Sequence, residues 1–239
     1  MLDPDATGNP LRPGAATHPA PSARLSLAPG ISVAYRPVNS GDEDRLAAEE
    51  AASLADCTIA VRRRAAAARI AARDLLAEVG WPDWSLPRRI GRGPPWPDGL
   101  TGSLSHCGDH AAAALAPRRI CAGIGIDIEP AEPLEADVLD FVATPEEAIA
   151  ADRHALSGRV LFCAKEAAYK AVHPLDGYFL EPREVVVDLR ALVATTPYGR
   201  TVSLALHVGR VIVALGMAQD PATAGGKRGI STQRWTIAR

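Results

Sequence analysis

Cysteine is scarce in this 239-residue sequence. The four cysteines form no C-x-x-C pair, which disfavours zinc ribbons and thioredoxin-like redox chemistry; they are Cys57, Cys107, Cys121 and Cys163. So few cysteines in so long a chain also exclude a disulfide scaffold. Free thiols in a reducing compartment are the simplest interpretation, and we therefore expect a cytoplasmic protein.

Long apolar runs are also missing, because none approaches the length of a membrane span. The N-terminus carries Asp3 and Asp5 and lacks the apolar stretch of a secretory signal. The charges nearly balance, with 26 Lys and Arg against 28 Asp and Glu. This balance excludes a uniformly basic surface but allows a local basic pocket. We expect neither a membrane nor a nucleic acid as a partner.

Proline and glycine gather at the N-terminus, where residues 1–30 are predicted to be a disordered tail. Residues 31–36 then alternate as a strand. Residues 43–79 are rich in alanine and free of glycine and proline, which predicts two helices that end before Gly80 and Pro82.

Short strands dominate the rest of the sequence. Residues 102–106 and 111–116 flank a turn, and residues 124–128 form a further strand. A helix is predicted over 160–172, followed by strands over 185–189, 201–208 and 211–217, a glycine-rich loop over 219–230 and a final strand over 234–238. Each half runs helices first and strands later. We therefore predict an α+β fold of two similar lobes, residues 31–121 and 122–239.

Two acidic residues share one face of the strand over 124–128. Asp127 and Glu129 alternate with isoleucines that point to the opposite face. Carboxylates at i and i+2 repel unless a cation or a basic group lies between them. The alternative is a strand end whose acids face water.

The segment Phe162–Lys170 places Glu166 and Lys170 four residues apart on one helix face. Alone, this spacing is typical of a surface ion pair. Together with Asp127 and Glu129, however, Glu166 completes a set of three carboxylates without a nearby His or Cys ligand. Such all-oxygen donors favour Mg²⁺ over zinc, and Mg²⁺ takes further ligands from water and substrate phosphates.

Ser105 and His106 end a strand that follows a Pro-rich loop with three arginines, Arg88, Arg89 and Arg92. A lone histidine is more often structural, but a histidine near several guanidinium groups favours an anion site. No Walker A or G-x-G-x-x-G motif is present, so side chains and metal would have to hold a polyphosphate. A Ser-His-Asp hydrolase is disfavoured because adjacent residues of a strand point to opposite faces.

Three motifs in this order resemble those of the 4′-phosphopantetheinyl transferases. They are Gly125–Glu129, Phe162–Lys170 and, upstream, Trp96–Cys107, which is similar to the motif of the Sfp-type group. The resemblance covers about residues 60–185. It implies a monomer of two pseudo-symmetric lobes with coenzyme A in the cleft between them. It also implies transfer of the 4′-phosphopantetheine arm to a serine of an acyl or peptidyl carrier protein, with adenosine 3′,5′-bisphosphate as the other product.

The resemblance further implies roles for single residues. Asp127, Glu129 and Glu166 would hold Mg²⁺, or Mn²⁺, on the pyrophosphate. Lys170 would contact the phosphates, and Glu166 is the natural acceptor for the serine proton. The residues expected to bind coenzyme A are Arg62, Arg69, Arg88, Ser105, His106, Asp127 and Lys170.

Two other interpretations stay open. A Mg²⁺-dependent phosphohydrolase acting on coenzyme A or a nucleotide would need the same carboxylates. A binding module that kept the fold would need only the anion site. A further alternative concerns the helical arginines Arg62, Arg69 and Arg73, which could simply form a solvent-exposed helix face.

Overall fold

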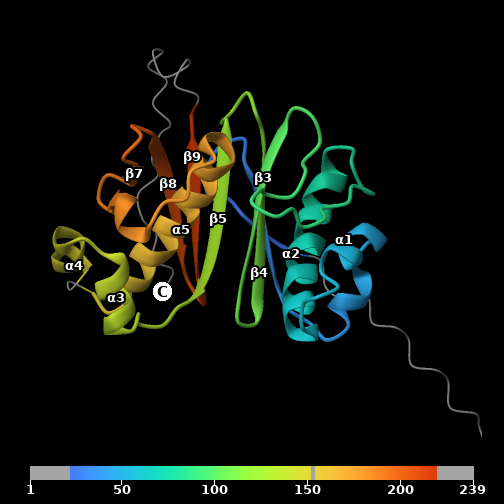
Figure 1. Cartoon of the computed structure of the whole chain (residues 1–239), viewed down its shortest axis with the longest axis horizontal. Helices are drawn as coiled ribbons and strands as arrows, with labels where there is room; N and C mark the ends of the chain where they lie inside the picture. Colours follow the sequence, from blue (N-terminus) through green and yellow to red (C-terminus); the bar gives the residue numbers. More distant parts are fainter. Residues whose placement is uncertain (1–21, 152–153, 220–239) are drawn as a thin grey trace, which may run out of the picture.

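Two antiparallel sheets, each carrying one long helix, form the body of the structure, a computed structural model that describes residues 22–151 and 154–219 (Figure 1). The N-terminal sheet has the strand order β1-β2-β4-β3, and the C-terminal sheet has the order β5-β9-β8-β7-β6. The strands are β1 Ala23–Leu25, β2 Ser32–Pro37, β3 Leu100–Cys107, β4 His110–Pro117, β5 Gly123–Pro130, β6 Val186–Asp188, β7 Val193–Thr195, β8 Thr201–Val208 and β9 Val211–Ala218. The α-helices are α1 Ala48–Ser53, α2 Ile59–Glu78, α3 Ala136–Val142, α4 Pro145–Ala151 and α5 Ser157–Asp176, and the 3₁₀ turns are η1 Asp42–Arg45 and η2 Pro182–Glu184.

The two halves of the chain repeat one arrangement. In each half a first strand precedes a 20-residue helix, and a hairpin follows. The first strand pairs with the second strand of that hairpin, so β2 pairs with β4 and β5 pairs with β9. The predicted α+β fold of two similar lobes is therefore confirmed.

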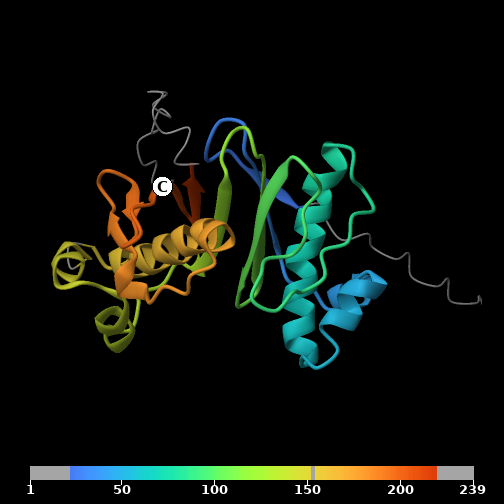
Figure 2. The ribbon, with the colours of Figure 1, turned by 45° about the horizontal axis from the view of Figure 1, so that its top comes forward.

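The two sheets pack against each other between the two long helices (Figure 2). Ile124, Ile126 and Ile128 of β5 share one buried cluster with alanines of β4. On the outer side of the N-terminal sheet, α2 packs through Ala72 and Leu75. On the outer side of the C-terminal sheet, α5 packs through small residues. The molecule thus has four layers, helix, sheet, sheet and helix.

The start of the fold differs from the prediction, which extended the tail to residue 30. Strand β1 lies inside that range and pairs with β2, with Leu25 opposite Val33. Arg24 forms an ion pair with Glu78 of α2 at 2.6 Å. Gly30, at a φ of 73°, belongs to the turn that leads into β2, so the glycine that suggested a tail is a turn residue.

The sequence pattern also did not predict α3, α4 or β7, which are seven, seven and three residues long. Such short elements show too few turns or alternations for a period to emerge. The strand predicted over 234–238, and all but the first residue of the loop predicted over 219–230, lie outside the described residues. No helix in the described ranges has the length and apolar character that crossing a bilayer requires.

Candidate active site

Helix α5 lies directly on the backbone of β5 and β9, because glycines face it there. Gly125 and Gly216 are paired across the two strands. A Cβ atom on Gly125 would overlap the carbonyl oxygen of Ala167, and one on Gly216 would lie 2.8 Å from the same oxygen. This close approach brings the charged side chains of α5 to the carboxylates of β5.

Asp127, Ser105 and Lys170 meet where β5, β3 and α5 come together. The Ser105 hydroxyl donates to Asp127 Oδ1 at 2.8 Å, and Lys170 Nζ donates to the same oxygen at 2.6 Å and to Ser105 Oγ at 3.1 Å. Burial alone would lower the pKa of Lys170, but the charge and hydrogen bond of Asp127 outweigh it and raise that pKa. Lys170 is therefore a permanent cation in the free protein.

Asp127 is only 4% exposed, and its second oxygen, Oδ2, is buried without a hydrogen-bond partner. A buried carboxylate oxygen without a partner is costly unless a ligand completes it. This atom is the strongest structural sign that the cluster is built to hold something more.

Glu129 binds an arginine that the sequence interpretation did not consider. Arg159 Nη1 donates to Glu129 Oε2 at 3.2 Å, and the same side chain reaches the carbonyl oxygens of Glu132 and Pro133. Burial, and next the nearby charge of Asp127, raise the pKa of Glu129 despite this arginine. The one sequence signal for Arg159 is its place two turns before Glu166 on the same face of α5, and that spacing does not identify its partner.

Glu166 lies half-buried on α5, one turn before Lys170. Burial raises its pKa, Lys170 opposes that change, and Asp127 adds to it. Lys170 makes its ion pair with Asp127 rather than along the helix. Lys165, the other lysine of this motif, is buried and holds Glu147 at 2.7 Å, so its role is structural.

Within the described ranges, no group of three or more His, Cys, Asp or Glu side chains could hold a metal ion in its present conformation. Two of the three expected ligands, Asp127 and Glu129, form ion pairs with Lys170 and Arg159 instead. The chemistry nevertheless fits a hard cation, because Asp127 Oδ2 is unpartnered and the donors are all oxygens.

A cationic cleft of about 350 Å³ opens beside this cluster. Helix α2, strand β3, the loop before β3 and Lys170 line it, through Ala65, Ala68, Arg69, Arg88, Arg89, Arg92, Pro94, Leu104, Ser105, His106 and Lys170. Its charged lining residues are all basic, which suits a polyanion. Five of the seven residues expected to bind coenzyme A therefore line one cleft, and Asp127 adjoins it through Lys170.

His106 lines the cleft and is solvent-exposed. Desolvation, followed by the charges of Arg64 and Lys170, lowers the pKa of His106. The neutral imidazole is therefore favoured in the free protein. Arg64, to which the sequence assigned no part in this site, is thus one of the cations that act on it.

The three helical arginines have separate roles. Arg69 is buried and donates to the carbonyl oxygens of Leu86, at 2.8 Å, and Ala65, so it ties the loop to α2. Arg73 forms an ion pair with the buried Glu50 at 2.8 Å. Arg62 is not among the described residues that line the cleft, and its Nε is buried without a hydrogen-bond partner.

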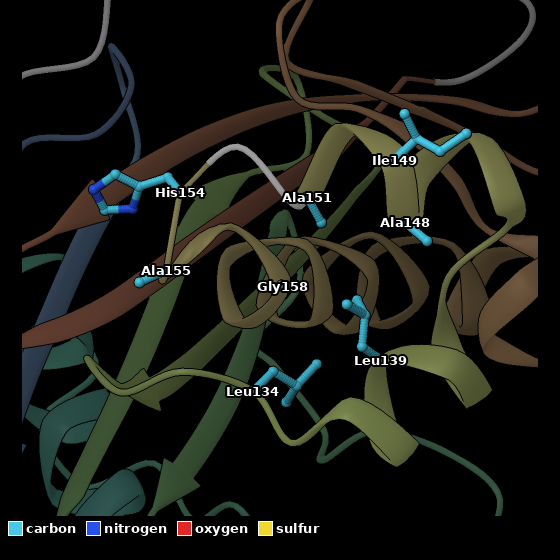
Figure 3. Close-up of a pocket in the computed structure, with 8 residues that line it drawn as sticks. All are labelled: Leu134, Leu139, Ala148, Ile149, Ala151, His154, Ala155 and Gly158. Atoms are coloured by element: carbon cyan, nitrogen blue, oxygen red, sulfur yellow. The ribbon is translucent and has the colours of Figure 1, made fainter.

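A second cavity, of about 480 Å³, lies between α3, α4 and the start of α5 (Figure 3). Its lining is mostly apolar and includes Leu134, Leu139 and Ile149. His154 lies at its edge, and none of the three carboxylates Asp127, Glu129 and Glu166 is among its lining residues. This cavity is therefore separate from the cluster around Asp127.

Comparison with known proteins assigns the two lobes to one family. Residues 49–116 match the 4′-phosphopantetheinyl transferase N-terminal domain, and residues 123–214 match the 4′-phosphopantetheinyl transferase superfamily. The two matches include α2, the β3–β4 hairpin, β5 and α5, which build the cluster and the cleft.

Three curated relatives carry the same name. The chain is 44% identical to the 4′-phosphopantetheinyl transferase Npt of Nocardia iowensis over 126 residues, which are 50% of this chain and 55% of that protein. It is 40% identical to Svp of Streptomyces mobaraensis over 149 residues, 59% and 60% of the two chains. It is 37% identical to PptT of Mycobacterium tuberculosis over 136 residues, 55% and 60%. The chain thus spans a little more than half the length of these relatives. It belongs to the 4′-phosphopantetheinyl transferase superfamily.

Proposed function

We propose that this protein transfers 4′-phosphopantetheine from coenzyme A to a serine hydroxyl of an acyl or peptidyl carrier protein, with release of adenosine 3′,5′-bisphosphate. The observation that carries the proposal is the position of Lys170. It lies between the carboxylate of Asp127 and a cleft lined with arginines, where a pyrophosphate with an anionic nucleotide end would fit. The family assignment supports the same reaction.

The reaction forms one bond and breaks one. The serine oxygen of the carrier attacks the phosphorus next to the pantetheine arm, and the bond from that phosphorus to the bridging oxygen breaks. Catalysis of such a transfer consists mostly of positioning and of cancelling negative charge. Lys170 supplies positive charge to the phosphate oxygens, and Glu166, directly or through a water, accepts the serine proton.

Magnesium belongs to this proposal as the metal that neutralises the pyrophosphate when bound. Asp127, Glu129 and Glu166 would hold it, and Mn²⁺ would suit the same oxygen donors. The unpartnered Oδ2 of Asp127 supports this assignment. Lys170 and Arg159 would then turn from the carboxylates toward phosphate and the segment after β5.

Coenzyme A would lie along the cationic cleft. We assign its phosphates to Arg69, Arg88, His106 and Ser105, with Arg89 and Arg92 as further lining cations. Arg62 belongs to this assignment by its family position alone. We further propose a cytoplasmic monomer, with lobes that divide at residues 121 and 122, which modifies carrier domains of polyketide, nonribosomal-peptide or siderophore assembly.

Intact-protein mass spectrometry tests the reaction. An apo carrier protein is incubated with this protein, coenzyme A and Mg²⁺, beside a sample with EDTA. We expect a mass gain of one phosphopantetheinyl group that EDTA abolishes. If adenosine 3′,5′-bisphosphate appears at a comparable rate without any carrier protein, the phosphohydrolase interpretation replaces the transferase.

Two variants test the catalytic residues in the same assay. Lys170→Met and Glu166→Gln should each lower the transfer rate by about 100-fold or more, because each removes a charge at the reacting atoms. Glu146→Gln, an exposed residue of α4, is the matched control and should keep full activity. Full activity of Glu166→Gln would contradict both its metal and its proton-transfer role.

A further inference from the structure

The edge of the C-terminal sheet meets the edge of the N-terminal sheet at the site. β5 ends one sheet and β3 ends the other, and they lie next to each other in both views (Figures 1 and 2). The two strands do not pair through their backbones. Something else must therefore satisfy the inward-facing backbone groups of β5.

Two serines of β3 bridge the two strands. The backbone N–H of Ile126 donates to Ser103 Oγ at 3.1 Å, and the Ser105 hydroxyl donates to Asp127 Oδ1 at 2.8 Å. Both hydrogen bonds are buried. Because Ser103 and Ser105 are two residues apart, they project from the same face of β3. We call these four residues, Ser103, Ser105, Ile126 and Asp127, the seam.

Apolar side chains also join the sheets near the seam, and there burial, followed by the charge of Glu129 on β5, raises the pKa of the Cys107 thiol on β3. Ile126 packs in the cluster that includes Ala112 and Ala114 of β4. Apolar contacts are non-directional, so they define the position of one strand along another less sharply than a hydrogen bond does. A hydrogen bond to a backbone amide fixes the position of the strand along its length. Ser103 supplies that fixed point one residue before Asp127.

We propose that Ser103 is a positioning residue, which holds β5 against β3 so that Asp127 and Lys170 keep their alignment with the cleft. The effect of Ser103 on the transfer rate rests on the proposed transferase function. Ser103 is not among the described residues that line the cleft. Its loss should therefore affect the chemical step more than coenzyme A binding.

Three variants of Ser103 separate the hydrogen bond from the space that it fills. Ser103→Ala removes the acceptor, and Ser103→Cys keeps a similar size but accepts weakly. Ser103→Thr keeps the hydroxyl, and threonine suits a strand. We expect Ala and Cys to lower kcat by about 10-fold or more with KM for coenzyme A changed less than about 2-fold, and Thr to retain most of kcat.

Amide hydrogen exchange, followed by NMR, measures the protection of the Ile126 amide and does not depend on enzymatic activity. In Ser103→Ala and Ser103→Cys the Ile126 amide should exchange about 10-fold faster or more, because it loses its partner. Amides of β5 that pair with β9 serve as the internal reference and should stay protected. Ser85→Ala is the matched control, since Ser85 Oγ is buried without a hydrogen-bond partner and its loss should change neither readout.

The proposal is overturned if Ile126 exchange is unchanged in Ser103→Ala, or if Ser103→Thr loses as much kcat as Ser103→Ala. It is also overturned if KM rises while kcat holds. Should Ser103→Ala fail to fold, the Cys and Thr variants carry the same comparison. A wild-type protein that transfers nothing would refute the proposed function, whereas the exchange of Ile126 would still decide whether Ser103 fixes β5.

Discussion

At the scale of single residues, His106 is the side chain whose charge we expect ligand binding to change. Desolvation, and then the charges of Arg64 and Lys170, lower its pKa in the free protein. A phosphate beside the ring favours the imidazolium and raises that pKa. Affinity for adenosine 3′,5′-bisphosphate should then be highest below the free-state pKa and fall, by about 10-fold in total, as the pH rises through the bound-state pKa. Isothermal titration calorimetry across this pH range measures the affinity for adenosine 3′,5′-bisphosphate.

The ligand's own phosphates also titrate, so a variant must isolate the histidine. His106→Gln should lack this component of the pH dependence. His110→Gln, in the same hairpin but outside the cleft lining, should keep it. Identical pH profiles for His106→Gln and the wild type would refute the role of His106 as an anion ligand.

At the level of single residues, the sequence predicted a site residue when its place on a strand or helix face followed from its spacing to nearby residues. Asp127 and Lys170 could be placed on a strand face and a helix face, and the structure joins them at 2.6 Å. Arg159 and Arg64 were harder to assign, because an arginine on a helix has many possible partners and sequence does not give its neighbours in space. Arg69 also holds a loop while it lines the cleft, since its Nε and Nη1 donate to carbonyl oxygens.

At the scale of elements, the position of α5 depends on the glycines beneath it. Gly125→Ala would force the helix away from β5, because the new Cβ would overlap backbone atoms of Ala167. We expect the free energy of unfolding to fall by about 3 kcal/mol, because an extra carbon atom at a rigid contact forces the backbone to shift. Urea denaturation followed by circular dichroism measures this loss.

Gly93→Ala is the control for this substitution, because a Cβ there meets nothing within 4 Å. Its free energy of unfolding should stay within about 0.5 kcal/mol of the wild type. If Gly125→Ala is equally neutral, α5 does not rest on the strand backbone as described.

The same packing explains why some elements could be predicted and others could not. α5 and β5 carry long, regular patterns of small and apolar residues, so their periods are visible in the sequence. β1 has three residues, and its stability comes from pairing with β2 and from an ion pair to α2. Tertiary partners of this kind leave no periodic signal.

At the scale of the whole molecule, one apolar cluster joins the two lobes. It combines Val33 of β2 with Ile126 of β5 and Val213 of β9. Neither lobe can unfold without exposing this shared core, so we expect a single cooperative unfolding transition. Tryptophan fluorescence and far-ultraviolet circular dichroism should give coincident transitions in urea.

The positions of the tryptophans allow fluorescence to report on one lobe alone. Trp81, Trp84 and Trp96 all belong to the N-terminal half, and a Trp235→Phe background removes the fourth. Fluorescence then reports on one lobe, while circular dichroism reports on the helices of both. A fluorescence midpoint clearly separated from the dichroism midpoint would show that the lobes unfold independently.

Strand β3 joins the basic cleft to the acidic cluster through one residue. Ser105 lines the cleft beside His106 and also donates to Asp127 of β5. The distance between the cationic lining and the acidic cluster is therefore set by a residue of a paired strand and not by a movable loop. Their spacing would thus be fixed before any macromolecular partner arrives.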